Sequence, residues 1–340
     1  MKVARLYDYL DVRIEEEPVP TPGPGEAVVR MRVCGICSGD VVAWYIRKKA
    51  PLVFGHEPAG EIAALGTGVK TFREGQRVFV HHHAPCLQCR ACARGEFVQC
   101  AVWKQTNIRP GGMAEYFLVP EVNLRHDTLL LPDAVGFEDA ALIEPTACVV
   151  KSLRRAGELR GATVLVIGLG VMGQLHVLLA RAAGAERILA ADLIEDRCRH
   201  ARGLSADLVF NASEVDLAAA VAEATDGEGA EVVIAGPATV AALELGLRCA
   251  ARGGTVVQFM GTAPGAKLEL DTFDYYFREL RLVPSYSCGP PDTREALRLI
   301  ETGVVGAHHV VTHRFGLSEA AKAYEHAATN TSAIKTLVTS

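Results

Sequence analysis

Residues 162–173 read ATVLVIGLGVMG, a β-branched apolar run followed at once by closely spaced glycines. The run predicts a buried strand, and the residues after it predict a helix that begins with Val171 and Met172. Three glycines stand in the register G-x-G-x-x-G: Gly168, Gly170 and Gly173. In that register the first glycine permits a tight turn, the second lets the backbone approach a pyrophosphate, and the third allows close helix–strand packing. The segment therefore predicts a dinucleotide-binding loop, with the N–H groups of the helix N-terminus facing the phosphates.

The next predicted strand, RILAAD, ends on Asp192, nineteen residues after Gly173. A carboxylate at this place accepts hydrogen bonds from both ribose hydroxyls of NAD and repels the 2′-phosphate of NADP. The sequence therefore predicts NAD rather than NADP as the cofactor. Arg197 lies five residues further on, either as a second cofactor contact or as a solvated residue of the following helix.

Strands and helices alternate around this loop from about residue 147 to residue 285. The expected strands are ATVLVI, RILAAD, ADLVFNA, AEVVIA and GTVVQFMG, and the segments between them have helical patterns. Such alternation predicts right-handed βαβ units and a doubly wound parallel sheet. The residues before it are rich in short β segments, and those after it are mixed, with HHVVTHRFG expected as a strand that starts at His308 and His309. The predicted fold class is α/β plus β, in three segments: 1–147, 148–285 and 286–340.

Residues 161–180 carry no charge over twenty positions, which is the length of a membrane span. Four glycines, Gln174 and His176 interrupt this run, so a strand–turn–helix unit within a sheet explains it better. The N-terminal MKVARLYDYLDV lacks the apolar core of a signal peptide. We therefore expect a cytoplasmic protein.

The composition of the 340 residues is typical of a globular protein with large cores, because 49% are hydrophobic and 22% are charged. This balance excludes disorder. Thirty-five basic residues against forty acidic ones give a net charge of −5, and no stretch is strongly basic. Nucleic acid and anionic membranes are therefore poor partners.

Four of the ten cysteines fall within fifteen residues, in the spacing C-x2-C-x2-C-x7-C. They are Cys86, Cys89, Cys92 and Cys100. Without a secretion signal, a disulfide framework is not expected. Four thiolates in a short loop match the tetrahedral preference of zinc, and a site with all four positions filled by protein is structural. An iron–sulfur cluster also uses four cysteines, whereas four unrelated packing cysteines in one polar loop would be a coincidence.

Three segments outside the alternating part offer further metal ligands. They are GICSGD with Cys37, GHE with His56 and Glu57, and EPTAC with Glu144. Thiolate, imidazole and carboxylate together suit a catalytic zinc with an open position. Each residue alone also has an ordinary structural explanation: a core thiol, a loop histidine, or an acid in the first turn of a helix. The three histidines at 81–83 are expected mainly to pack or to face solvent, with polar contact near the active site as the alternative.

In their order along the chain, these motifs resemble the zinc-dependent medium-chain dehydrogenase/reductase family. The resemblance rests on GICSGD, GHEPAGEIAALGTGV, the four-cysteine loop, PGGMAEYFLVP, EP at 144–145, GLGVMG and THRFGLSEAAKAYEHA. Glu144 stands where alcohol dehydrogenases of that family carry cysteine, which resembles the polyol (sorbitol) dehydrogenase branch. The resemblance implies a GroES-like catalytic domain interrupted by a Rossmann domain, and a homodimer or homotetramer.

The resemblance also implies roles for the candidate ligands and an activity. Cys37 and His56 match the catalytic zinc ligands, Glu57 and Glu144 match two acidic positions of which either ligates, and the cysteine loop matches a structural zinc site. The implied activity is oxidation of a secondary alcohol or polyol with NAD, using two zinc ions per chain. An amino alcohol such as threonine and a cyclitol are alternative substrates. A non-catalytic protein that binds NAD and zinc is the alternative from another class.

Two features depart from the family pattern. The family commonly carries a hydroxyl group two residues after the ligand cysteine, where this chain has Gly39. The substrate proton is then expected to leave either through Ser38 or through water and a carboxylate, Glu57 or Glu144. The stretch between the cysteine and histidine ligands is also shorter than in many relatives, which would alter the substrate mouth.

Overall fold

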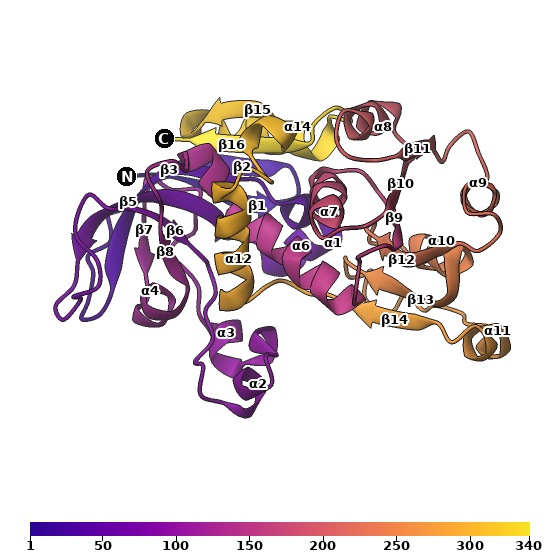
Figure 1. The fold of residues 1–340 in the computed structure, drawn as a ribbon. Coiled ribbons are helices and arrows are strands. Elements are labelled where there is room, and N and C mark those ends of the chain that lie inside the picture. Colours follow the sequence, from indigo (N-terminus) through magenta and orange to yellow (C-terminus); the bar gives the residue numbers. More distant parts are fainter. The chain divides into compact units, whose positions relative to one another are not determined.

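The computed structural model describes residues 1–340 and divides the chain into two compact units (Figure 1). Unit 1 combines Met1–Ala147 with Cys288–Ser340, and unit 2 is Cys148–Ser287. Helix α6, Ile143–Ala156, contains the first boundary between them. The uncharged run at 161–180 divides into a strand and a helix, and no helix of the chain has the length and apolarity that a membrane crossing requires.

Unit 2 is built on a six-stranded parallel sheet in the order β11-β10-β9-β12-β13-β14. Its strands are β9 (Thr163–Ile167), β10 (Arg187–Asp192), β11 (Leu208–Asn211), β12 (Ala230–Ala235), β13 (Ala250–Gln258) and β14 (Arg281–Pro284). Val166 of β9 pairs with Ala190 on one side and Ile234 on the other. The glycine loop therefore follows a central strand at the point where the strand order reverses. The predicted doubly wound sheet is confirmed.

Helices connect these strands, as the alternation predicted. They are α7 (Val171–Ala182), α8 (Glu195–Arg202), α9 (Leu217–Ala224), α10 (Val240–Cys249) and α11 (Thr272–Phe277). Apolar side chains such as Leu165, Val233 and Leu247 bury each other in one cluster. The edge strand β14 has no counterpart among the expected strands, because RLVP is short and ends in proline, which a sheet tolerates at an edge.

Unit 1 contains two sheets. A three-stranded sheet has the order β2-β1-β4, and a seven-stranded sheet has the order β15-β16-β3-β5-β6-β8 with β7 paired to β3. The strands are β1 (Lys2–Asp8), β2 (Asp11–Glu16), β3 (Ala27–Gly35), β4 (Leu52–Val53), β5 (Glu57–Leu65), β6 (Arg77–Val80), β7 (Tyr116–Val119), β8 (Thr128–Leu130), β15 (Val311–Gly316) and β16 (Lys335–Thr339). Because β16 pairs with β3, the C-terminal segment completes the sheet that carries the candidate ligands.

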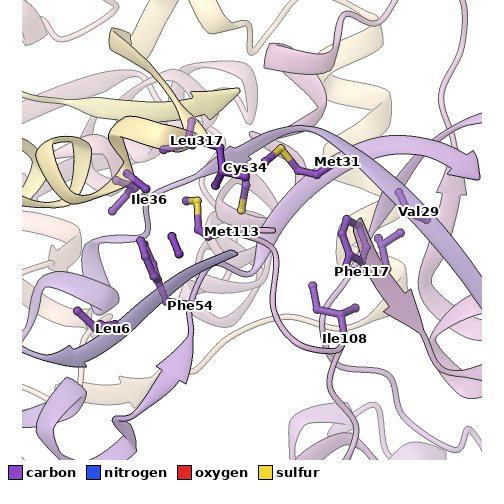
Figure 2. Packing of buried hydrophobic residues seen from close by; sticks show 14 of the residues in the cluster. Leu6, Val29, Met31, Cys34, Ile36, Phe54, Ile108, Met113, Phe117 and Leu317 are labelled. Atoms are coloured by element: carbon purple, nitrogen blue, oxygen red, sulfur yellow. The ribbon is translucent and has the colours of Figure 1, made fainter. Parts of the chain in front are cut away.

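The core of unit 1 lies between these sheets and their covering segments (Figure 2). Met31, Cys34, Phe54, Met113 and Phe117 are all buried in one apolar cluster. The C-terminal segment contributes to the same cluster, so both parts of unit 1 share one core. Burial of this kind is the main favourable contribution to folding.

Short helices make up the rest of unit 1. They are η1 (Ser38–Val41), α1 (Ala43–Lys49), α2 (Arg90–Ala93), η2 (Phe97–Gln99), α3 (Ala101–Gln105), α4 (Glu121–Asp127), α5 (Phe137–Ala140), α12 (Pro290–Glu301), α13 (Ala307–Val310), η3 (Leu317–Glu319) and α14 (Ala320–Thr329). The expected strand start at His308 and His309 is wrong, because both residues lie in α13. The Nδ1 atom of His309 lies 3.1 Å from the N–H group of Gly306 and caps this helical turn. The strand β15 begins only at Val311.

Candidate active site

The pairing of β3 with β5 brings the first candidate ligands together. The two strands are antiparallel, with Gly35 opposite Glu57. Cys37 follows the end of β3 as the N-cap of η1, and His56 directly precedes β5. The ligand atoms of Cys37, His56 and Glu57 all lie within 4.8 Å of one another. Three residues expected from two separate motifs therefore meet at one point.

The environment of the Cys37 thiol is suited to a metal ligand. Its Sγ accepts a hydrogen bond from the backbone N–H of Gly39 at 3.3 Å. Burial raises the pKa of the Cys37 thiol, and the neighbouring His56 opposes that rise. Because zinc binds the thiolate and itself stabilises that form, a buried cysteine beside a histidine fits a zinc site.

Asp40 orients His56. The Nδ1 atom of His56 lies 3.5 Å from Oδ2 of Asp40, and this buried carboxylate oxygen has no hydrogen-bond partner. Burial lowers the pKa of His56, but the Asp40 carboxylate and the Cys37 sulfur more than offset it, so the pKa is raised well above the usual value. A carboxylate behind one ring nitrogen leaves the other nitrogen for a metal ion, which is the common arrangement behind ligating histidines.

Glu57 is not a free carboxylate. It forms an ion pair with Lys335, whose Nζ also donates a hydrogen bond to the Ile36 carbonyl at 3.0 Å. Both side chains of the pair are at most 1% exposed. Burial raises the pKa of Glu57, and Lys335 opposes that rise. Burial lowers the pKa of Lys335, but Glu57 more than offsets it, so the net shift is upward.

Glu144, the fourth expected ligand, lies in a neighbouring cluster. Its carboxylate, His81 and His82 have ligand atoms within 4.8 Å of one another. The His82 ring is 4.7 Å from the His56 ring, and the buried Nδ1 of His82 has no hydrogen-bond partner. The site therefore extends from the Cys37 group through the histidines to Glu144.

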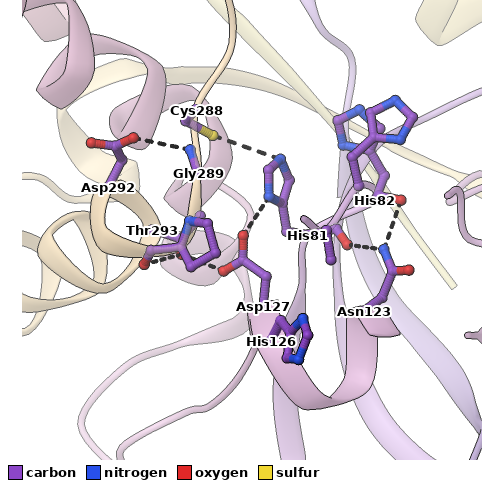
Figure 3. Close-up of polar contacts among 12 residues, drawn as sticks. His81, His82, Asn123, His126, Asp127, Cys288, Gly289, Asp292 and Thr293 are labelled. Atoms are coloured by element: carbon purple, nitrogen blue, oxygen red, sulfur yellow. Dashed lines mark hydrogen bonds and ion pairs between the residues drawn. The ribbon is translucent and has the colours of Figure 1, made fainter. Parts of the chain in front are cut away.

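The histidines at 81–83 were expected mainly to pack, but His81 lies in a buried polar network (Figure 3). Its Nδ1 is 2.6 Å from Oδ2 of Asp127, and its Nε2 is 3.6 Å from Sγ of Cys288. Thr293 donates a hydrogen bond to the other Asp127 oxygen at 2.5 Å, and Asn123 donates to the carbonyl of His81. The network joins the end of β6 to α4 and to the start of α12.

The four-cysteine loop has the geometry of a closed zinc site. All four sulfur atoms lie within 4.8 Å of one another, and the Cys89–Cys92 and Cys86–Cys100 pairs are each 3.6 Å apart. A tetrahedron with zinc–sulfur bonds of ~2.3 Å has edges of about 3.8 Å. Burial raises the pKa of Cys100, but backbone hydrogen bonds outweigh it and lower the value to about 6. The loop therefore fits zinc in the distances between its sulfur atoms.

The glycine loop in unit 2 has the backbone that its register predicts. Gly168 has a φ of 88°, in the left-handed region that favours glycine. Gly170 is the N-cap of α7 and has nothing within 4 Å of where a side chain would begin. A Cβ on Gly173 would collide with the carbonyl oxygen of Gly168. Val171 and Met172 form the first turn of α7, so its free N–H groups lie at the loop.

Asp192 is held at this loop by two backbone hydrogen bonds. One oxygen accepts from the N–H of Leu169 at 2.6 Å, and the other accepts from the N–H of Ile194 at 2.9 Å. The side chain of Arg197 lies 3.8 Å from the same carboxylate. Arg197 is therefore next to Asp192 and is not a remote solvated residue of α8.

Two family models match the chain. The alcohol dehydrogenase GroES-like domain matches residues 23–132, and the zinc-binding dehydrogenase domain matches residues 171–302. A sorbitol dehydrogenase of Halalkalibacterium halodurans is 32% identical over 96% of this chain and 95% of its own length. An L-threonine 3-dehydrogenase of Pyrococcus horikoshii is 31% identical over 91% of this chain and 90% of its own length. A solved structure of a proposed zinc-binding dehydrogenase of Sinorhizobium meliloti, bound to NADP, superposes with a TM-score of 0.90 at 29% identity, covering 100% of this chain and 99% of that one.

Proposed function

The chain belongs to the zinc-dependent medium-chain dehydrogenase family, and on that premise we propose that it transfers a hydride between a secondary alcohol or polyol and NAD. The observation that carries the proposal is the meeting of Cys37, His56 and Glu57 at the ends of paired strands. Thiolate, imidazole and carboxylate form a ligand set that catalytic zinc prefers. The 32% identity with a sorbitol dehydrogenase over 96% of the chain supports the substrate class.

The residues of this site would hold the metal and position the alcohol. Cys37, His56 and one carboxylate, Glu57 or Glu144, are the proposed ligands. When bound, zinc supplies Lewis acidity at the substrate oxygen. Asp40 fixes the orientation of the His56 ring from behind. Lys335 compensates the charge of Glu57, which is necessary because an unpaired buried carboxylate is costly.

The hydride acceptor would bind unit 2. The N–H groups at the start of α7 would hold the pyrophosphate, and Asp192 would accept hydrogen bonds from the adenosine ribose. A nicotinamide cofactor bound there would supply the acceptor for the hydride and its two electrons, and the alcohol oxygen would also have to give up its proton. Ser38, together with the carboxylates of Glu57 and Glu144, is the group of candidates that would receive this proton.

The experiment that tests the function is a panel of polyols and secondary alcohols with NAD and NADP, followed by the absorbance of the reduced cofactor. Sorbitol, xylitol and 2,3-butanediol should be oxidised. The zinc-loaded protein should show no turnover when zinc is removed by a chelator. If the protein binds NAD and zinc but reduces no cofactor with any alcohol, it is instead a non-catalytic protein with the fold of this family.

The same panel separates a second candidate function. The chain is 31% identical to an L-threonine 3-dehydrogenase along nine-tenths of its length, which favours an amino alcohol as the alternative substrate. L-threonine and a cyclitol such as myo-inositol are therefore included in the panel, and their kcat/KM values are compared with those of the polyols. Higher kcat/KM for threonine than for every polyol would replace the polyol assignment.

We expect two zinc ions per chain, one at each cysteine-containing site. Cys89→Ala should lower the zinc content from about two to about one, because the closed site loses one of four ligands. Since structural metal binding contributes directly to folding, the variant should also unfold at lower temperature. Elemental analysis after chelator-free purification and a thermal melt measure both effects. A wild-type content of one or none, or an unaltered melt of Cys89→Ala, would contradict this expectation.

We expect NAD preference to depend on the charge of Asp192. Asp192→Asn removes the negative charge and keeps one oxygen as an acceptor for a backbone N–H group, while its amide nitrogen cannot accept from the second N–H group. A lost charged hydrogen bond costs about 1.5–3 kcal/mol, so kcat/KM for NAD should fall at least ~10-fold. The ratio of NADP to NAD activity should rise at the same time. Wild-type activity with NADP that greatly exceeds the activity with NAD would show that Asp192 does not select the cofactor.

A further inference from the structure

Helix α1 lies in the sequence between the candidate ligands Cys37 and His56, and it carries an aromatic and a basic side chain on one face. Tyr45 and Lys49 are four residues apart, which places them side by side on a helix. The Lys49 ammonium lies 3.9 Å from the centre of the Tyr45 ring. The Trp44 ring packs edge-on against the same ring with centroids 5.6 Å apart. The Tyr45 ring is therefore held in place by its neighbours.

The Tyr45 ring borders the candidate active site. A Cβ on Gly39 would lie 4.0 Å from Cε1 of Tyr45 and 3.6 Å from Sγ of Cys37. The space beside Gly39 is therefore bordered by both the Tyr45 ring and the Cys37 sulfur. Burial raises the pKa of the Tyr45 phenol, and His56, Asp40 and Cys37 act on it in turn, as expected for a neighbour of the site.

Lys49, on the same face of α1 as Tyr45, also lies near the candidate site. Its charge is among the groups that keep the pKa of His82 well below the usual value, after burial and the neighbouring histidines. It acts in the same direction on His83, whose pKa burial lowers to about 4. The Lys49 charge therefore lies near enough to His82 and His83 to oppose their protonation.

The Tyr45 hydroxyl group has no partner within the chain. The contacts of the half-buried side chain are made by its ring, and its oxygen forms no hydrogen bond. By contrast, the buried Tyr324 donates a hydrogen bond to the Asp40 carbonyl at 2.6 Å. A polar group at the rim of a site that the protein leaves unpaired is suited to fix the orientation of a ligand.

We propose that Tyr45 hydrogen-bonds a second hydroxyl group of the substrate, on the carbon next to the reacting one, and so selects vicinal diols and polyols over simple alcohols. This inference rests on the proposed function. The reacting oxygen belongs at the metal ligands, and the Tyr45 ring borders the same space beside Gly39 as the Cys37 sulfur. The position of Tyr45 therefore suits the hydroxyl group on the neighbouring carbon of the substrate, and not the hydroxyl group that is oxidised.

The test compares 2,3-butanediol with 2-butanol, which share a carbon skeleton and differ by one hydroxyl group. Tyr45→Phe removes only the phenol oxygen. It should lower kcat/KM for 2,3-butanediol about 10-fold and leave that for 2-butanol within about 2-fold, as expected for the loss of one neutral hydrogen bond. The loss should lie mainly in KM. Tyr276→Phe, in an exposed tyrosine of α11, is the matched control and should change neither value.

Lys49→Met provides a second variant that does not touch the hydroxyl group. Without the ammonium the ring is held less firmly, so the diol preference should fall by a smaller factor than in Tyr45→Phe. Equal losses for both alcohols in Tyr45→Phe, or an unchanged diol preference in both variants, would overturn the inference and leave the proposed function standing. A wild-type enzyme that oxidises neither alcohol, nor any polyol of the panel, would overturn the proposed function and this inference with it.

Discussion

Replacing His56 with alanine should lower kcat/KM for alcohol oxidation by about a thousand-fold while leaving the protein folded. The imidazole is one of three ligand groups that meet at the candidate site, and Asp40 orients it from behind. Lewis-acid stabilisation by a catalytic metal amounts to several kcal/mol, and each ~1.4 kcal/mol corresponds to ten-fold in rate. Loss of a ligand should therefore abolish most of the rate enhancement.

Zinc content and thermal stability show whether the loss is specific. His56→Ala should retain about one zinc ion per chain, because the four-cysteine loop is separate from the mutated site. His308→Ala, in the exposed part of α13, is the matched control and should keep full activity and both ions. Activity of His56→Ala within ten-fold of wild type would remove His56 from the metal site. Unfolding of the variant would show a structural role instead.

The fold of unit 2 could be predicted because its signals are local. Each expected strand contains a short apolar run, and the central ones are typical of strands buried on both faces of a sheet. The glycine register follows directly on the strand ATVLVI and precedes a helix, so the loop and its neighbours are read from a dozen residues. The edge strand β14 was not predicted, because it is short and ends in Pro284 and because its position depends on pairing with β13.

The candidate active site was predicted only in part, for the same reason. Cys37, His56 and Glu57 lie in short recognisable motifs. Their supporting partners are distant in sequence: Lys335 pairs with Glu57 across 278 residues. Cys288 contacts His81 across 207 residues. Because this partner is so distant, the sequence around the three histidines predicted mainly packing. The role of Asp40 depends on the approach of His56 from the neighbouring strand, which no spacing reveals.

Replacing Asp127 with alanine should destabilise unit 1 by about 3–5 kcal/mol, the usual cost of removing one partner from a buried ion pair. Asp127 and His81 are both fully buried, and the carboxylate also accepts the Thr293 hydrogen bond. The variant would leave the imidazole and the Thr293 hydroxyl without this acceptor. The chain has two tryptophans, Trp44 and Trp103, and both belong to unit 1. Urea unfolding followed by tryptophan fluorescence therefore reports on this unit.

The matched control is Asp11→Ala, which removes an aspartate from the exposed ion pair with Arg13. Exposed pairs contribute little, so this control should leave the unfolding midpoint nearly unchanged. Equal effects of Asp127→Ala and Asp11→Ala would show that the buried network does not stabilise the unit. Thr293→Val should fall between them, because it removes one hydrogen bond but leaves the ion pair.

The pH dependence of the Asp127 effect distinguishes an ion pair from a neutral hydrogen bond. Burial lowers the pKa of His81, but Cys288 and Asp127 more than offset it, so the pKa in the folded state is well above the usual value. A histidine of this kind contributes its full stabilisation below the unfolded pKa of about 6.5 and loses it as the pH rises through the folded pKa. Asp127→Ala removes one of the charges responsible. The stability difference between wild type and variant should therefore be larger at about pH 6 than at about pH 9, and an equal difference at both values would mean that His81 is neutral in the folded protein.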